Sequence, residues 1–252
     1  MIMTTQYAII TGASGGIGGA IAKRLAAEGY GLALLGNRSS GRLAAVEKEC
    51  KIRLQETGSS AQVLSRTGDL GNSSTVSELM NEILTVFPHI DLLVNCAGIS
   101  YVGLLTDMTD SDWNSMIQTN LSSVFYCCRS IVPHFVHNKK GRILNISSVW
   151  GNSGASCEVA YSAAKGGLNT FTKALAKELA PSQIAVNALA CGMIDTPMNH
   201  CFSDEEIRSI CEEIPAGRMG TPEEAAEMIA LLAKAPVYLT GQIITMDGGW
   251  VI

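Results

Sequence analysis

The sequence predicts an α/β fold in which one parallel sheet of seven strands is covered by helices on both faces. Seven short aliphatic runs alternate with longer amphipathic segments, and this alternation produces right-handed crossovers in a parallel sheet. Several of the runs are almost wholly apolar, as strands buried on both faces are. We therefore expect a doubly wound sheet in a single domain over residues 1–252, with one half at about 1–140 and the other at about 141–252.

Each predicted strand is a short aliphatic run, and each predicted helix has apolar residues at three- and four-residue spacing. In chain order, the predicted strands cover residues 7–10, 31–35, 61–65, 91–95, 142–147, 184–189 and 242–246. The predicted helices cover about 16–28, 41–56, 73–87, 111–138, 160–179 and 222–233. Because no low-complexity linker or internal repeat interrupts the alternation, one domain is the simplest interpretation.

An irregular stretch from about 190 to 221 follows the sixth predicted strand. It contains prolines and three helix-start signals, Ser203, Asp204 and Thr221. Long ordered loops on a rigid scaffold often carry binding functions. We expect residues 192–221 to form a lid over the substrate.

Charge and cysteine content argue against several classes of partner. The net charge is −5, and no basic block is longer than a pair such as Lys139–Lys140, so we do not expect nucleic-acid binding. The eight cysteines form no CxxC pair and no Cys/His cluster with zinc spacing, so we expect no metal site. Cysteines of this kind fit a reducing cytosol.

The amino-terminal segment has neither the basic region nor the cleavage signal of a secretory leader. No apolar run approaches the ~20 residues that a membrane span needs. We therefore expect a soluble, cytoplasmic protein that does not associate with membranes.

The first predicted strand is followed by a glycine-rich turn, TGASGGIG, at residues 11–18. Glycine adopts positive φ angles and lets a phosphate approach the backbone, and the helix that follows directs its N-terminal amides at that phosphate. The strand–turn–helix context is the one that dinucleotide binding requires, although a glycine turn without a ligand is the alternative. The predicted cofactor residues of this turn are Gly12, Ser14, Gly15, Gly16, Ile17 and Gly18.

The end of the second predicted strand bears on the choice between NAD and NADP. An acidic residue about 20 positions after the glycine turn would bond the ribose 2′-hydroxyl and repel a 2′-phosphate. The sequence there is LLGNRSS, with Asn37 at the expected place and Arg38 beside it. A guanidinium suits a phosphate well, so we predict a preference for NADP(H), with NAD(H) still possible. The alternative is a surface arginine in a loop.

One tyrosine and one lysine stand four positions apart in EVAYSAAKGG, residues 158–167. On a helix, Tyr161 and Lys165 project from the same face, one turn apart. Taken alone, the segment also fits a partly exposed amphipathic helix with an ordinary tyrosine and a solvated lysine. The other motifs of the chain favour a functional pair.

The chain resembles the short-chain dehydrogenase/reductase family over nearly its whole length, which implies a Rossmann-type fold. The segments that carry the resemblance are TGASGGIG at 11–18, GDL at 68–70, NCAG at 95–98, TNL at 119–121, ISS at 146–148 and YSAAK at 161–165. Within the family, TNLSSVF, IPAGRMGTPEEAA and YLTGQIITMDGGW are most similar to the β-ketoacyl carrier-protein reductases of fatty-acid synthesis.

The resemblance implies a catalytic role for four residues. Tyr161 would protonate the substrate ketone, and Lys165 would lower the pKa of that phenol and bond the nicotinamide ribose. Ser148 would hold the carbonyl oxygen, and Ser147 would be its backbone-bonded neighbour. Asn120 matches the family asparagine that anchors a water relay behind the lysine; a contact with the backbone four residues earlier, or a helix kink, is the alternative.

The resemblance also implies further cofactor and substrate contacts. The additional cofactor residues are Asp69 and Leu70 for adenine, Asn95, Ala97 and Gly98 for the adenosine ribose, and Ile194 and Thr196 for the nicotinamide carboxamide. Trp150, Met193 and Met198 would line an apolar substrate pocket together with Ser148 and Tyr161, with plain core packing as the alternative.

Three positions depart from the family pattern. Cys191 stands where a proline usually precedes Gly192, so we expect a more mobile lid. Gly15 stands where many NADP-using relatives have an arginine. Of the two basic residues expected near the cleft for an acidic carrier protein, Lys139 is present, whereas the other position is Ser182.

The predicted function is NADPH-dependent reduction of a 3-oxoacyl thioester to the 3-hydroxyacyl form, with acyl carrier protein as a possible partner. The same chemistry on another small alcohol, sugar or steroid is the alternative, followed by a non-catalytic dinucleotide-binding regulator. The resemblance implies a homotetramer, and the apolar carboxyl terminus, TGQIITMDGGWVI, suggests burial against a partner subunit.

Overall fold

Seven parallel strands form one sheet in the order β3-β2-β1-β4-β5-β6-β7. The computed structural model describes residues 5–251, with only the backbone at residue 200; the predicted domain ends, 1–4 and 252, lie outside the described residues. The strands are β1 (Tyr7–Thr11), β2 (Gly31–Gly36), β3 (Val63–Thr67), β4 (Leu92–Asn95), β5 (Gly141–Ser148), β6 (Ile184–Cys191) and β7 (Ile243–Met246). The predicted Rossmann-type sheet of seven strands is therefore confirmed.

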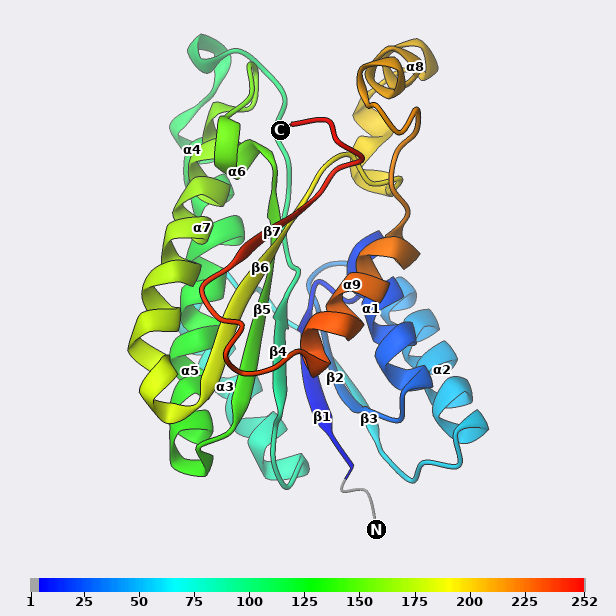
Figure 1. Cartoon of the computed structure of the whole chain (residues 1–252), viewed down its shortest axis with the longest axis vertical. Coiled ribbons are helices and arrows are strands. Elements are labelled where there is room, and N and C mark those ends of the chain that lie inside the picture. Colours follow the sequence, from blue (N-terminus) through cyan, green and yellow to red (C-terminus); the bar gives the residue numbers. More distant parts are fainter. Residues whose placement is uncertain (1–4, 252) are drawn as a thin grey trace.

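Helices cover both faces of the sheet, with α1, α2 and α9 on one face and α3, α5 and α7 on the other (Figure 1). The helices are α1 (Gly16–Ala27), α2 (Ser40–Glu56), α3 (Ser73–Val86), α4 (Asp110–Ile117), α5 (Ser123–Asn138), α6 (Trp150–Ser153), α7 (Val159–Leu179), α8 (Asp204–Glu213) and α9 (Pro222–Lys234). This arrangement makes one domain of three layers.

The central strands divide the core into two clusters because successive side chains point to opposite faces. Ile10 and Leu34 pack with α1 and α9, whereas Ile9 and Leu93 pack with α3 and α5. Every residue of β2 and β6 is buried, as the apolar runs predicted. Burying each leucine or isoleucine stabilises the fold by about 1.5–3 kcal/mol.

Two elements differ from the sequence prediction. The third strand is Val63–Thr67 rather than 61–65, because its polar end pairs with β2 through to Gly36 at the sheet edge. The predicted continuous helix at 111–138 is divided into α4 and α5 by a π-helical turn at Gln118–Ser122. The short helix α6 was not predicted.

The segment predicted as a lid contains the 3₁₀ turn Pro197–Cys201 and helix α8. Ser203 caps α8 in a capping box with Glu206, and Thr221 caps α9 in the same way with Glu224. These two predicted helix starts are confirmed. The lid prediction itself concerns motion over a substrate and stays a prediction.

The sheet order reverses between β1 and β4, where the connections leave toward opposite faces. In open α/β sheets, a crevice forms at the carboxyl ends of the strands at this switch point, and ligands bind there. The glycine turn follows β1 at this edge. In residues 5–251, no helix is long and apolar enough to cross a bilayer.

Candidate active site

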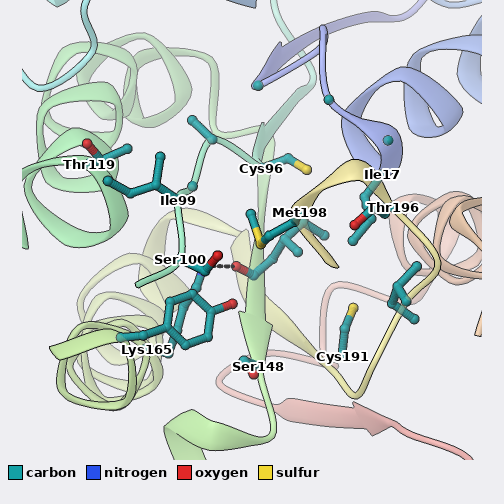
Figure 2. A pocket seen from close by; sticks show the side chains of 18 of the residues that line it. Ile17, Cys96, Ile99, Ser100, Thr119, Ser148, Lys165, Cys191, Thr196 and Met198 are labelled. Carbon is teal, nitrogen blue, oxygen red and sulfur yellow. Dashed lines mark hydrogen bonds between the residues drawn. The ribbon is translucent and has the colours of Figure 1, made fainter. Parts of the chain in front are cut away.

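A cleft of about 1260 Å³ lies at the carboxyl ends of the strands. The glycine turn lines its outer part, and the segments after β5 and β6 line its inner part. Figure 2 shows Ser148, Lys165, Cys191 and Met198 around the inner part. Motifs that lie more than a hundred residues apart in the sequence therefore share one cavity.

Two glycines of the turn, Gly12 and Gly18, are packed so closely that a side chain cannot replace them. Gly12 has a φ of +67°, and a Cβ there would lie 2.8 Å from the backbone of Ala97. A Cβ at Gly18 would collide with the carbonyl oxygen of Gly12. The Oγ1 of Thr11 accepts hydrogen bonds of 3.0 and 3.1 Å from the amides of Cys96 and Ala97, which joins the ends of β1 and β4.

Helix α1 presents a bare N-terminus to the cleft. Its N-cap, Gly15, has no capping side chain, and its first turn contains no acidic residue. A Cβ at Gly16 would lie 2.7 Å from the Cγ2 of Thr196, so the turn also touches the segment after β6. Free amides, the positive end of the helix dipole and the absence of side chains fit the phosphates of a dinucleotide.

Two guanidinium groups line the outer end of the cleft, after β2. The predicted residues Asn37 and Arg38 are there, and so are Ser39 and Arg42, which sequence reasoning missed. The Nη2 of Arg42 donates a 2.6 Å hydrogen bond to the Oγ of Ser39. The sequence could have indicated Arg42, because its spacing of four residues from Arg38 places both arginines beside the start of α2.

Ser148, Tyr161 and Lys165 converge at the inner end of the cleft. Ser148 is the last residue of β5, and its Oγ accepts a 3.2 Å hydrogen bond from the amide of Trp150. Tyr161 and Lys165 lie one turn apart on α7, with the Nζ of Lys165 5.6 Å from the centre of the tyrosine ring. The same Nζ donates a 2.9 Å hydrogen bond to the carbonyl oxygen of Ile146.

Burial dominates the titration of this pair. It raises the pKa of the Tyr161 phenol, the Glu158 carboxylate raises it further, and the Ser148 hydroxyl lowers it. Burial also lowers the pKa of Lys165 to about 8. We expected Lys165 to lower the pKa of the phenol; that effect stays a prediction, and burial is the largest influence on the phenol in this structure.

Asn120 is completely buried inside the π-helical turn and does not line the cleft. Its Nδ2 donates to the carbonyl oxygens of Ile99 (3.0 Å) and Met116 (3.1 Å), and its Oδ1 accepts from the amide of Ile99 (3.0 Å). A Cβ at Gly98 would lie 2.8 Å from this Oδ1 and 3.8 Å from the Nζ of Lys165. The backbone contact and the helix distortion that we considered as alternatives are therefore both present, and Asn120 also lies behind Lys165.

Asn95 and Ser147 differ from their predicted surroundings. Asn95 does not line the cleft; its Nδ2 donates a 2.9 Å hydrogen bond to the Oδ1 of Asn145 beneath it. Ser147 donates a 2.6 Å hydrogen bond to the Oδ1 of Asn169 rather than to the backbone. Both side chains bond partners within the fold, although Ser147 also lines the cleft.

Comparison with known proteins agrees with this geometry. The profile of the short chain dehydrogenase family matches residues 6–207. The chain is 43% identical over 246 residues to the uncharacterized oxidoreductase YmfI of Bacillus subtilis (strain 168), covering 97% of this chain and 98% of the relative. It is 37% identical over 245 residues to the 3-oxoacyl-(acyl-carrier-protein) reductase FabG of Escherichia coli (strain K12), covering 97% and 96%.

The chain belongs to the short-chain dehydrogenase/reductase family. It is therefore an NAD(P)-dependent oxidoreductase. A FabG reductase of Chlamydia muridarum is also 37% identical, over 250 residues that cover 98% of each chain. The predicted family, fold and enzyme class are thus confirmed.

The cleft of this short-chain dehydrogenase/reductase collects most of the predicted site residues. Those that line it are Gly12, Ser14, Gly15, Gly16, Ile17, Gly18, Asn37, Arg38, Asp69, Leu70, Ala97, Gly98, Ser148, Trp150, Tyr161, Lys165, Met193, Ile194, Thr196 and Met198. Only Asn95 and Asn120 lie beneath its surface. Within residues 5–251, no group of three or more metal-ligating side chains is assembled.

The substrate half of the short-chain dehydrogenase/reductase cleft is more aromatic than the sequence predicted. Trp250 packs edge-on against Trp150, with ring centres 4.9 Å apart at an angle of 64°. The Asp247 carboxylate fixes this tail by accepting hydrogen bonds from the amides of Gly249 (2.9 Å) and Val251 (2.8 Å). Trp250, near the carboxyl terminus, thus contacts its own chain, and burial of this segment against a partner subunit stays a prediction. The other lining residues that sequence reasoning missed include Glu158, Phe202, Ile210 and Glu213.

Lys139 does not lie where a carrier protein was expected to approach. It follows α5, immediately before the start of β5, whereas Ser148 ends β5 at the cleft. The eight residues of β5 separate the two, so Lys139 lies at the opposite end of the strand from the cleft. Within this chain, Lys139 is therefore not the basic residue near the cleft that we expected.

Proposed function

We propose that this protein reduces the ketone of a 3-oxoacyl thioester to the 3-hydroxyacyl form, with NADPH as the cofactor. The observation that carries the proposal is the convergence of Ser148, Tyr161 and Lys165 in the cleft that the glycine turn enters. The choice of a thioester is supported by relatives named as 3-oxoacyl-(acyl-carrier-protein) reductases. We assign most cofactor contacts to a half at about 1–140, and the catalytic residues and the substrate to a half at about 141–252, with about 192–221 as its lid.

Ser148 orients and polarises the substrate carbonyl. Its Oγ already accepts from the amide of Trp150, so its own hydrogen is free to bond the carbonyl oxygen. This bond stabilises the negative charge that develops on that oxygen during reduction. When bound, the dinucleotide supplies the hydride that the carbonyl carbon receives.

Tyr161 donates the proton that completes the alcohol. Because burial raises the pKa of its phenol, the side chain holds its proton at neutral pH, as a donor must. Lys165 lies close enough to stabilise the phenolate that remains. A buried lysine with a pKa near 8 is still largely charged at pH 7. Asn120 positions this end of the cleft from behind Gly98.

The outer end of the cleft favours NADPH over NADH. Arg38 and Arg42 offer two planar cations to a 2′-phosphate, and Ser39 offers a hydroxyl. Among the described lining residues, the only carboxylate at this end is Asp69, after β3, which accepts a 3.0 Å hydrogen bond from the amide of Gly71. Arg38 and Arg42 therefore take the place of the arginine that many NADP-using relatives have at the position of Gly15.

We also infer that the protein works as a cytoplasmic homotetramer. The eight cysteines are free thiols, as in a reducing compartment. Large apolar side chains that a subunit interface would cover are exposed, including Leu104, Leu105, Phe125 and Tyr238. Light scattering tests the assembly, and a mass equal to the 26.7 kDa chain contradicts it.

The oxidation of NADPH, followed by absorbance, tests the proposed reaction. We expect turnover of acetoacetyl-CoA and of the acetoacetyl carrier-protein thioester, with the carrier-protein form preferred if the carrier contributes to binding. Turnover of a sugar or steroid ketone, without turnover of either thioester, contradicts the proposed substrate class. Absence of turnover with every ketone, while NADPH still binds, indicates a non-catalytic dinucleotide-binding protein.

A further inference from the structure

Glu158 is a carboxylate that the proposed reaction does not use, although it lines the substrate half of the cleft. It is the N-cap residue of α7 and precedes Tyr161 by about one helical turn, which separates such side chains by roughly 5–6 Å at Cβ. Its backbone is held by the amide of Ser162, which donates a 2.8 Å hydrogen bond to the Glu158 carbonyl. The position of the carboxylate beside the reacting ketone is thus fixed by the helix start.

The surroundings of Glu158 are apolar and aromatic. Burial raises the pKa of its carboxyl, and the side chain of Trp150 acts in the opposite direction. Trp250 packs edge-on against Trp150, so a second indole lies next to the one that bonds the carboxylate. No lysine, arginine or described histidine lies within 4.0 Å of this carboxylate in residues 5–251. A half-buried carboxylate without a cationic partner is stabilised when a bound ligand brings a hydrogen-bond donor to it.

The charge of this half of the cleft restricts the ligand group. Apart from Lys165, the charged side chains among its described lining residues are Glu158 and Glu213. An anionic group is therefore repelled, whereas an uncharged N–H donor is accepted without leaving a second charge buried. The arm of a carrier thioester has its first amide N–H six bonds beyond the ketone carbon, on a stretch that is uncharged as far as the distant phosphate.

We propose that Glu158, together with the indoles of Trp150 and Trp250, forms a recognition subsite whose carboxylate accepts a hydrogen bond from the first amide N–H of the thioester arm. The inference rests on the proposed thioester reduction and names the group that this cleft recognises beyond the ketone. Glu158 is accordingly a specificity residue. Because its charge also raises the pKa of Tyr161, the test compares two thioesters at one pH, where this shared effect cancels in their ratio.

Two thioesters, one with the terminal amide group and one without it, test the subsite, and the Glu158 variants separate the N–H donor from the rest of that group. Acetoacetyl-N-acetylcysteamine has the amide N–H, and S-ethyl acetothioacetate lacks it. We expect the wild type to prefer the first by about tenfold in kcat/KM, the effect of a hydrogen bond to a charged acceptor. Glu158→Leu removes the preference by raising KM for the amide substrate alone, and Glu158→Gln keeps part of it because its amide oxygen still accepts.

Glu178→Gln is the matched control, because Glu178 is an exposed glutamate on the same helix. It should leave the preference unchanged. Binding gives a second readout: 3-hydroxybutyryl-N-acetylcysteamine, added to the NADPH complex, should quench tryptophan fluorescence with a dissociation constant about tenfold weaker in Glu158→Leu. NADPH binding by each variant shows that the fold is intact.

The outcomes separate the subsite from the reaction itself. If both thioesters are reduced and Glu158→Leu keeps the wild-type preference, the subsite is wrong and the proposed function stands. If neither thioester is reduced while another ketone is, the proposed function fails and the subsite fails with it. An equal loss with both substrates in Glu158→Leu also overturns the subsite, because it indicates damage to the reacting centre.

Discussion

Lys165 follows Tyr161 by one turn of α7, and its Nζ lies 5.6 Å from the centre of the tyrosine ring. The same Nζ donates a hydrogen bond to the carbonyl oxygen of Ile146. The ammonium is therefore held by the end of β5 rather than by the phenol. This arrangement leaves the Tyr161 hydroxyl free to face a substrate, while the positive charge stays near enough to stabilise a phenolate.

Tyr161→Phe removes the proposed proton donor without changing the shape of the cleft. We expect kcat for ketone reduction to fall by about 10²–10⁴-fold, with the affinity for NADPH retained. Stopped-flow assays and fluorescence titration of NADPH measure the two quantities. A variant with wild-type turnover would show that another group protonates the ketone.

Lys165→Met tests the burial of the ammonium through the pH dependence of stability. Burial lowers the pKa of Lys165 in the folded protein from 10.5 to about 8, so between these values the unfolded chain binds the proton and the folded chain does not. The free energy of unfolding of the wild type should therefore rise relative to Lys165→Met by about 3 kcal/mol from pH 8 to pH 10.5.

Below pH 8 both states of the wild type hold the Lys165 proton, so the difference between the two proteins should be constant there. Chemical denaturation of the ligand-free proteins across pH 6–11 measures it. Loss of the hydrogen bond to Ile146 in Lys165→Met changes the free energy of unfolding by the same amount at every pH, so it does not affect the pH dependence of the difference. A difference that does not vary with pH contradicts the lowered pKa.

Arg38→Asp introduces the carboxylate that the end of β2 lacks. We expect the ratio of kcat/KM for NADPH to that for NADH to fall at least tenfold, because a phosphate contact is replaced by repulsion. Arg42→Ala should lower the same ratio by a smaller factor, since the other guanidinium remains. Lys51→Ala, on the exposed side of α2, is the control. Unchanged selectivity in both arginine variants removes them from the phosphate site.

Gly18→Ala and Gly41→Ala compare two helical glycines in different surroundings. A Cβ at Gly18 collides with the carbonyl oxygen of Gly12, whereas nothing lies within 4 Å of a Cβ at Gly41. We expect Gly41→Ala to stabilise the protein by about 0.5–1 kcal/mol, since alanine favours a helix. Gly18→Ala should lose NADPH binding and stability. Thermal unfolding with and without NADPH measures both, and equal effects contradict the close packing of the turn.

Sequence reasoning was most successful where the relevant interactions are local. Apolar runs and glycine positions depend on near neighbours, so the sheet, the turn after β1 and the shared helix face of Tyr161 and Lys165 were predictable. The same holds for the helix starts at Ser203 and Thr221, whose side chains cap the amides three residues on.

The amino-acid sequence by itself determined the family, the strand order implied by it and the residue types at the inner end of the cleft. Only the tertiary structure decided that Asn95 bonds Asn145, that Trp250 meets Trp150 a hundred residues away, and that burial acts on the pKa of Tyr161. The physical reason is that contacts between distant segments, and the removal of water from a charge, depend on how the whole chain packs.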